Sequence, residues 1–152
     1  FTKKLCQIKI TKHNFCSRSC AAIYHNTHKA SGTRRSKLEK FLEENIKKLF
    51  PTLDCLYNDV KTIGSELDIF IPSINLAIQI NGPLHYLPIY GADKLKRIIE
   101  LDNIKKQACN NLNISLFEID VSKDKYFNKT KDNRWIEIKS IIELNLKRKL
   151  SA

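Results

Sequence analysis

The sequence predicts an α/β domain in which helices flank a small mixed β-sheet, with a short N-terminal module in front. Two short apolar runs, at 66–72 and 76–81, are separated by a turn that starts at Pro72, which indicates a β-hairpin. A third strand candidate lies at 114–119. The order helix, hairpin, helix, strand, helix is typical of a mixed sheet covered by helices.

The helices are predicted from capping signals and apolar spacing. Ser36 with Glu39 three positions later is a capping-box pattern, and Pro51 ends that helix. Its apolar face is expected to consist of Leu38, Phe41, Leu42, Ile46 and Leu49. A second helix is expected over 93–111, with an apolar set of Leu95, Ile98, Ile99, Leu101 and Ile104. Residues 122–134 are predicted to be irregular, and a last helix is expected from Trp135 to about Leu150.

Composition separates the chain into two parts. Residues 31–35 read as a linker, so we expect a basic, finger-like module at 1–33 and a larger domain at 34–152. With 152 residues, of which 42% are hydrophobic, the chain can bury a core. No apolar run approaches the roughly 18 residues that a membrane helix needs, so no membrane partner is expected.

Positive charge is concentrated at the N-terminus of a chain whose net charge is +11. Residues 1–37 contain no Asp or Glu. Their basic residues are Lys3, Lys4, Lys9, Lys12, Arg18, Lys29, Arg34, Arg35 and Lys37. Such an arm is typical of segments that neutralise nucleic-acid phosphates, although a solvated tail that only keeps the chain soluble has the same composition.

The cysteines and the first residue bear on the location of the protein. Five cysteines, an odd number, without a secretory signal favour an intracellular protein over a disulfide framework. The chain begins with Phe1 and has no Met, so we expect it to be a piece of a longer product. Abundant Ile, Lys and Asn are typical of AT-rich genomes, such as that of a mitochondrion, another organelle or a phage.

Polar side chains interrupt the apolar pattern of the hairpin. Strand side chains alternate between faces, so Leu67, Ile69 and Ile71 are expected on the core face and Asp68 on the other. Gln79 and Asn81 of the second strand are expected on the same face as Asp68, and His85 follows beyond a Gly-Pro turn. Oxygen ligands of this kind suit Mg²⁺, and a nearby His can transfer protons. A solvent-facing edge strand with a hydrated Asp68 fits the same pattern.

The segment from Gly64 to His85 resembles the central hairpin of PD-(D/E)XK nucleases, in particular the very-short-patch-repair-like group, which includes phage and intron-borne homing endonucleases. It is also similar to the RAP domain of organelle RNA-binding proteins. The resemblance covers about residues 34–120 and implies a restriction-endonuclease-like fold. It continues beyond the hairpin, through Tyr86, Pro88, Tyr90 and Gly91.

The resemblance implies a role for each of four residues. Asp68 would hold Mg²⁺, and Glu39 would support the metal or its water. His85 would act as general base or stabilise charge on the phosphate, and Asp102 would orient it. The implied activity is metal-dependent DNA cleavage of the homing or phage type. By their positions alone, Glu39 also fits a capping acid, His85 a structural turn residue and Asp102 an exposed helix residue.

One departure from the nuclease pattern is visible. Gln79 and Asn81 stand where the superfamily has an acidic residue and a Lys, which removes a negative charge and weakens Mg²⁺ binding. The alternative is therefore a catalytically inactive RNA-binding protein that derives from a nuclease, for example an accessory subunit of a mitochondrial ribosome. The expected partners are DNA or structured RNA such as rRNA, with a dimer or a ribonucleoprotein as the assembly.

The segment from Phe15 to Asn26 looks like the second half of a small zinc finger found in phage and algal-virus nucleases. Cys16 and Cys20 would supply two ligands, Cys6 a third, and His25 (or His13 or His28) the fourth. Position 3, where the family has its first Cys, is Lys3. A decayed finger with free thiols is the alternative.

Overall fold

The computed structural model describes residues 13–28 and 35–151, and the chain divides into two compact units, 1–34 and 35–152. The described part of the first unit contains helix α2 (Arg18–Thr27). The Ser17 hydroxyl caps this helix by accepting a hydrogen bond from the Cys20 N–H, at 3.1 Å. Serine is favoured at this position because its oxygen satisfies one of the free N–H groups of the first turn.

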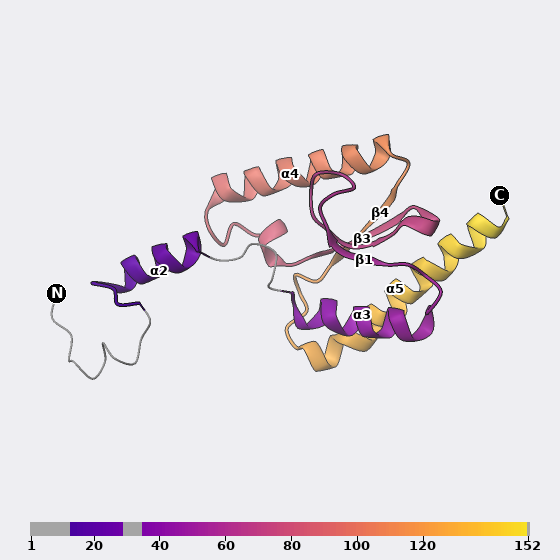
Figure 1. Ribbon diagram of the computed structural model, residues 1–152, viewed down its shortest axis with the longest axis horizontal. Coiled ribbons are helices and arrows are strands. Elements are labelled where there is room, and N and C mark those ends of the chain that lie inside the picture. Colours follow the sequence, from indigo (N-terminus) through magenta and orange to yellow (C-terminus); the bar gives the residue numbers. More distant parts are fainter. Residues whose placement is uncertain (1–12, 29–34, 152) are drawn as a thin grey trace. The chain divides into compact units, whose positions relative to one another are not determined.

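The second unit contains a four-stranded mixed sheet (Figure 1). The strands are β1 (Leu56–Asp59), β2 (Leu67–Ile71), β3 (Leu76–Asn81) and β4 (Ser115–Asp120), and they lie side by side in that order. The β1–β2 and β2–β3 pairs are antiparallel, whereas β3 and β4 are parallel. The predicted mixed sheet with its central hairpin is therefore confirmed.

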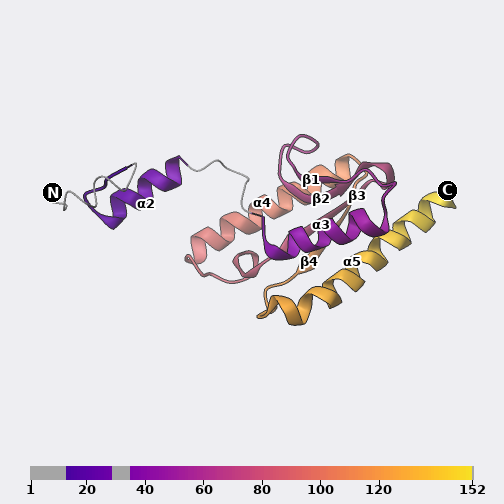
Figure 2. The same ribbon diagram turned by 60° about the horizontal axis from the view of Figure 1, so that its bottom comes forward.

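Helices cover both faces of this sheet, as Figures 1 and 2 show. Helices α3 (Lys37–Leu49) and α5 (Phe127–Leu150) lie beside each other on one face, and α4 (Ala92–Asn111) lies on the other. The capping box predicted for α3 is present, since Ser36 and Glu39 exchange two hydrogen bonds of 3.1 Å. The second unit is thus an α/β domain with a mixed sheet between helices, as predicted.

Two apolar clusters hold the layers together. On the first face, Ile69 and Ile78 of the sheet pack with Leu42 of α3 and Ile142 of α5. The second cluster is smaller and consists of Leu67, Phe70, Ala77, Cys109 and Ile114. Because both clusters include residues of β2 and β3, these two strands are buried on both faces and form the centre of the domain.

Several predictions about the elements are wrong. Strand β1 was not predicted, because its sequence Leu-Tyr-Asn-Asp is too short and polar to show an alternating pattern. Helix α5 begins at Phe127 rather than at Trp135, since its first two turns are polar in sequence after Phe127 and show no apolar periodicity. Leu49 is exposed although it was expected in the core.

Helix α4 also differs from its predicted orientation. Ile99, Leu101 and Ile104 are exposed, whereas Cys109 is fully buried. The side of the helix that faces the sheet carries a stripe of partly buried residues, among them Asp102 and Lys105. The apolar spacing misled the prediction because polar residues of this helix face inward toward a polar part of the sheet.

Among the helices of the described residues, none combines the length and apolarity that crossing a lipid bilayer requires.

The packing of α5 on the sheet can be tested with two truncations on one helix. Ile142 is fully buried, whereas Leu144 is 47% exposed. We expect Ile142→Ala to lower the free energy of unfolding by about 2–5 kcal/mol, because it leaves a cavity in the core. The control Leu144→Ala should change it by about 0.5 kcal/mol or less. Urea titration of the two variants provides the measurement, and equal losses would contradict this packing.

Candidate functional site

The candidate site lies where β2 and β3 stop pairing. The last backbone pair of this end is Ile69 with Ile78, and Asp68 and Gln79 are the next residues along the two strands. Beyond this point the Asp68 side chain takes the place of a backbone partner, because its Oδ2 accepts a hydrogen bond of 2.7 Å from the Ile80 N–H. β2 is an inner strand that β1 covers, so the hydrated edge-strand interpretation of Asp68 is wrong.

The alternation of faces holds for β3 but fails at the start of β2. Ile69, Ile71 and Ile78 belong to the cluster with α3 and α5, as expected. Leu67 instead packs into the second cluster with Phe70. Leu67 still pairs with Asp59 of β1, but Asn58, which lies opposite Asp68 between the pairs, has a left-handed φ of 53° that interrupts the regular pleat.

Burial makes ionisation of Asp68 unfavourable. Removal from water raises the pKa of Asp68 to about 6, and the negative charge of Glu39 adds to this rise. The hydrogen bond from Ile80 and the positive charge of Lys105 act in the opposite direction. A carboxylate in this situation favours a nearby cation, which is the property of a metal ligand.

Two buried amides follow Asp68 in the same part of the sheet. Gln79 is 7% exposed and Asn81 is 2% exposed. Gln79 Oε1 and Asn81 Oδ1 are buried without a hydrogen-bond partner in the described part of the chain. Carboxylate and amide oxygens are the kind of ligand that Mg²⁺ takes in proteins, although within the described residues no three His, Cys, Asp or Glu side chains gather around Asp68.

His85 and Asp102 form a dyad. His85 ends the short helix η2 (Pro83–His85), and its Nδ1 lies 2.7 Å from Oδ2 of Asp102 on α4. The pair lies between two cavities and lines both, one of about 220 Å³ and one of about 300 Å³. Glu66 and Lys105, which both act electrostatically on Asp68, line the second cavity. The dyad therefore lies in the same region as Asp68.

Glu118 belongs to this region, although sequence reasoning did not single it out. The parallel register places it opposite Gln79, its Oε1 accepts a hydrogen bond of 3.3 Å from Asn81 Nδ2, and its Oε2 lies 2.7 Å from Nζ of Lys106. Glu118 and Lys106 line the cavity of about 220 Å³ with the dyad. The only sequence signal was an acidic residue in an apolar strand candidate, and its partner strand was not predictable locally.

Glu39 lies apart from the dyad. Its side chain accepts the Ser36 N–H at 3.1 Å as part of the capping box, and Arg35 Nε lies 3.9 Å from its Oε2. It lines neither cavity of the dyad, but its charge reaches Asp68. Glu39 therefore acts as the capping acid and remains in electrostatic contact with the candidate metal ligand.

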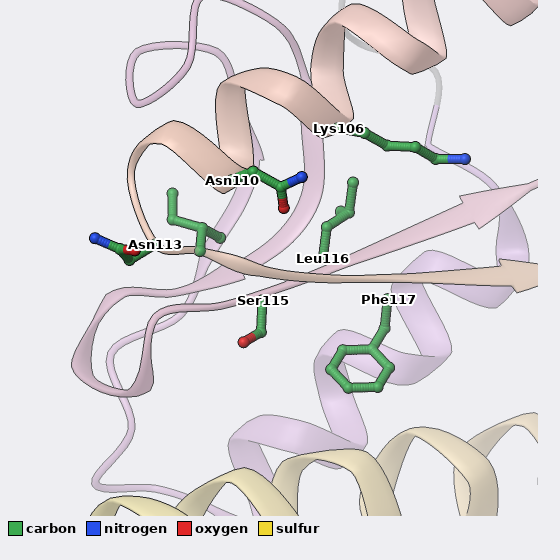
Figure 3. Close-up of a pocket in the computed structure, with 7 residues that line it drawn as sticks. Lys106, Asn110, Asn113, Ser115, Leu116 and Phe117 are labelled. Atoms are coloured by element: carbon green, nitrogen blue, oxygen red, sulfur yellow. The ribbon is translucent and has the colours of Figure 1, made fainter.

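A further cavity of about 610 Å³ lies at the other end of α4 (Figure 3). Lys106, Asn110 and Asn113 line it together with Ser115 at the start of β4. In Figure 3, Leu116 points toward α4, whereas Phe117 points toward the opposite face of the sheet. Neither His85 nor Asp102 lines this cavity, so its size does not make it the candidate site.

In the N-terminal unit, the thiols of Cys16 and Cys20 lie 3.1 Å apart on one side of the start of α2. Hydrogen bonds from Ser17 and then Cys16 lower the pKa of the Cys20 thiol. The His25 ring contacts Phe15 and Tyr24, with centroid distances of 5.4 and 5.8 Å. Within residues 13–28 and 35–151, no three His, Cys, Asp or Glu side chains gather around one metal position.

The predicted nucleic-acid contacts are only partly described. Six of the predicted basic contacts lie outside the described residues, namely Lys3, Lys4, Lys9, Lys12, Lys29 and Arg34. The predicted zinc ligand Cys6 also lies outside them. Arg18 and Lys37 are exposed. Arg35 is only partly exposed because it pairs with Glu43 and lies over the Tyr57 ring, 5.2 Å from its centroid. Its guanidinium is thus engaged within the domain.

Comparison of the chain with known family models, curated proteins and solved structures finds no match. The chemical interpretation of the site therefore rests on its own geometry.

The charge of Asp68 predicts a specific pH dependence. Its pKa is about 6 in the folded protein against 3.8 ordinarily, so the unfolded state ionises first as the pH rises from about 4 to 6. The free energy of unfolding should fall over this window by roughly 3 kcal/mol at most. Asp68→Asn should remove this contribution and be more stable at pH 7, because an amide oxygen can still accept the Ile80 N–H.

Urea unfolding of both proteins at pH 4 and pH 7, in EDTA, tests this. Other carboxyl groups titrate in both proteins, so the difference between the two pH dependences isolates Asp68. If the free energy of unfolding changes by the same amount between pH 4 and pH 7 in both proteins, ionisation of Asp68 does not destabilise the fold.

Proposed function

We propose that the chain is a metal-dependent DNA endonuclease of the homing or phage type, with a restriction-endonuclease-like fold. The observation that carries this proposal is the His85–Asp102 dyad, with its distance of 2.7 Å, in the same region as the half-buried Asp68. A histidine oriented by a carboxylate beside a carboxylate that favours a cation is an arrangement for hydrolysis. The net charge of +11 supports nucleic acid as the substrate.

In the proposed hydrolysis, the residues of the site would have separate roles. Asp102 would accept a hydrogen bond from the Nδ1–H of His85, which leaves Nε2 free to take a proton from the attacking water. Asp68 and Gln79 would hold Mg²⁺, which supplies a polarised phosphate and a more acidic water when bound. Lys105 lines the cavity of about 300 Å³ and would place positive charge near the phosphodiester as it gains negative charge, whereas Lys106 in the other cavity is paired with Glu118.

A second candidate function is RNA binding without cleavage, as in an organelle ribosome subunit. The observation that favours it is Gln79, which is buried at the strand position where the nucleases have an acidic residue. A neutral ligand binds Mg²⁺ less tightly than a carboxylate does. In this case the same basic surface would bind structured RNA, and the domain would act as a scaffold within a ribonucleoprotein.

Cleavage assays separate the two functions. With Mg²⁺ or Mn²⁺, the wild-type chain should cut plasmid DNA and EDTA should abolish cutting. His85→Ala should lower kcat by about 10²–10⁴, the range for loss of a general base. Asp102→Asn should lower kcat by about 10–10³ while DNA affinity is retained, because it removes the group that orients the base.

Asp93→Asn is the matched control, because Asp93 lies on the same helix in an exposed position. It should cut at the wild-type rate. Cleavage that survives His85→Ala would contradict the mechanism. If no metal supports cleavage and structured RNA is bound with strong salt dependence, the scaffold function replaces the endonuclease.

The N-terminal module is proposed to bind zinc through Cys6, Cys16, Cys20 and a histidine such as His25. We expect about one zinc ion per chain, which is the stoichiometry of a single tetrahedral site. Cys20→Ser should lose the ion, and Cys55→Ser, which alters a thiol of the other unit, should keep it. Elemental analysis of the purified proteins provides the measurement, and equal zinc content in both variants would refute the site.

A further inference from the structure

A further cavity, lined by both polar and apolar side chains, lies on the α3 and α5 side of the sheet ends. Its volume is about 480 Å³, which is within the usual range of roughly 300–1,000 Å³ for small-molecule sites. The first turn of α3, the ends of β3 and β4 and the start of α5 surround it. It shares no lining residue with the cavities of the His85–Asp102 dyad.

The charges that remain available in this cavity are positive. Its two acidic residues are engaged within the domain, Asp124 with Arg134 at 2.7 and 3.0 Å and Glu39 in the capping box. Its two lysines, Lys37 and Lys125, are exposed and form no ion pair within the residues that the structure describes. An anionic group would therefore find two unpaired cations here.

An aromatic surface completes the cavity. Phe127 lines it beside Ile80 and Val121. Phe41 holds the Phe127 ring edge-on at a centroid distance of 6.0 Å, and Lys131 Nζ lies 5.9 Å from the centre of the Phe127 ring. Free lysines next to a fixed aromatic ring are the combination with which proteins bind single nucleotides of a strand, since phosphates pair with the cations and bases stack on the ring.

The walls of the cavity are fixed by one arginine. Arg134 binds Asp124 through Nε and Nη2, and its Nη2 also donates to the carbonyl oxygen of Asp120 at 2.7 Å. These bonds hold the loop between β4 and α5, which carries Lys125. Lys125 is therefore presented by an ordered loop rather than by a loose one.

The cavity adjoins the proposed metal site through Glu39, which lines it and acts electrostatically on Asp68. We propose that this cavity holds one nucleotide of the bound strand next to the reacting phosphodiester, with its phosphate at Lys37 and Lys125 and its base against Phe127. This inference rests on the proposed function, because it takes nucleic acid as the ligand. It adds a binding subsite at the strand ends, on the side that α3 and α5 cover.

Binding of a short fluorescein-labelled DNA, single-stranded and duplex, to the full chain in EDTA tests the subsite without cleavage. Lys37→Ala and Lys125→Ala should each weaken binding about three- to tenfold and reduce the salt slope by about 1. Lys40→Ala and Lys123→Ala are matched controls, because both lysines are exposed neighbours that do not line the cavity. Each control should stay within about twofold of wild type.

Phe127→Leu supplies a second measurement, because it keeps an apolar side chain and removes the stacking surface. It should weaken single-stranded binding by about fivefold or more, in the range for loss of one base stack. Equal effects of cavity and control lysines, with Phe127→Leu unchanged, would overturn the subsite. If DNA binding depends on the cavity residues but the chain never cuts DNA, the proposed subsite stands and the proposed endonuclease activity is refuted. If the chain does not bind DNA at all, both proposals are refuted.

Discussion

The domain is organised around a half-buried carboxylate, that of Asp68, at the point where the central strands β2 and β3 stop pairing. Asp68 accepts the Ile80 N–H across β2 and β3, so it satisfies a backbone group that has lost its strand partner. Strand β1 on one side and the two helical layers keep water away, which raises the pKa of Asp68 to about 6. The layers that stabilise the fold thus also make ionisation of Asp68 unfavourable.

The topology then brings distant polar groups to this point. Parallel pairing of β3 with β4 places Glu118 opposite Gln79, and α4 crosses the same face of the sheet. Asp102, Lys105 and Cys109 follow one another at helical spacing on α4, so the helix delivers a carboxylate and an amine to the site and a buried thiol to the core. The inward polar residues explain why Ile99, Leu101 and Ile104 remain outside.

Local pattern and resemblance predicted the parts of this site that depend on short stretches of chain. The hairpin followed from two apolar runs and a turn, and the capping box from Ser36 and Glu39. Glu118 and Lys106 were not predicted, because their meeting depends on the parallel register of β4 and on the angle of α4, neither of which is encoded locally. The early start of α5 was missed because its first turns are polar in sequence, and the contacts that hold them, Phe127 with Phe41 and Arg134 with Asp124, join residues that are not neighbours in the chain.

The half-buried Asp68 carboxylate bears on the choice between enzyme and scaffold. A scaffold needs only an acceptor for the Ile80 N–H, and an asparagine would provide one without a cost of ionisation. At neutral pH the aspartate introduces that cost, with the charge of Glu39 adding to it. A cation that binds Asp68 would remove the cost and use the unpartnered oxygen of Gln79 as well. The ionisable side chain at position 68 therefore supports the proposed metal site over the proposed scaffold, and the neutral Gln79 would lower the affinity of that site for Mg²⁺.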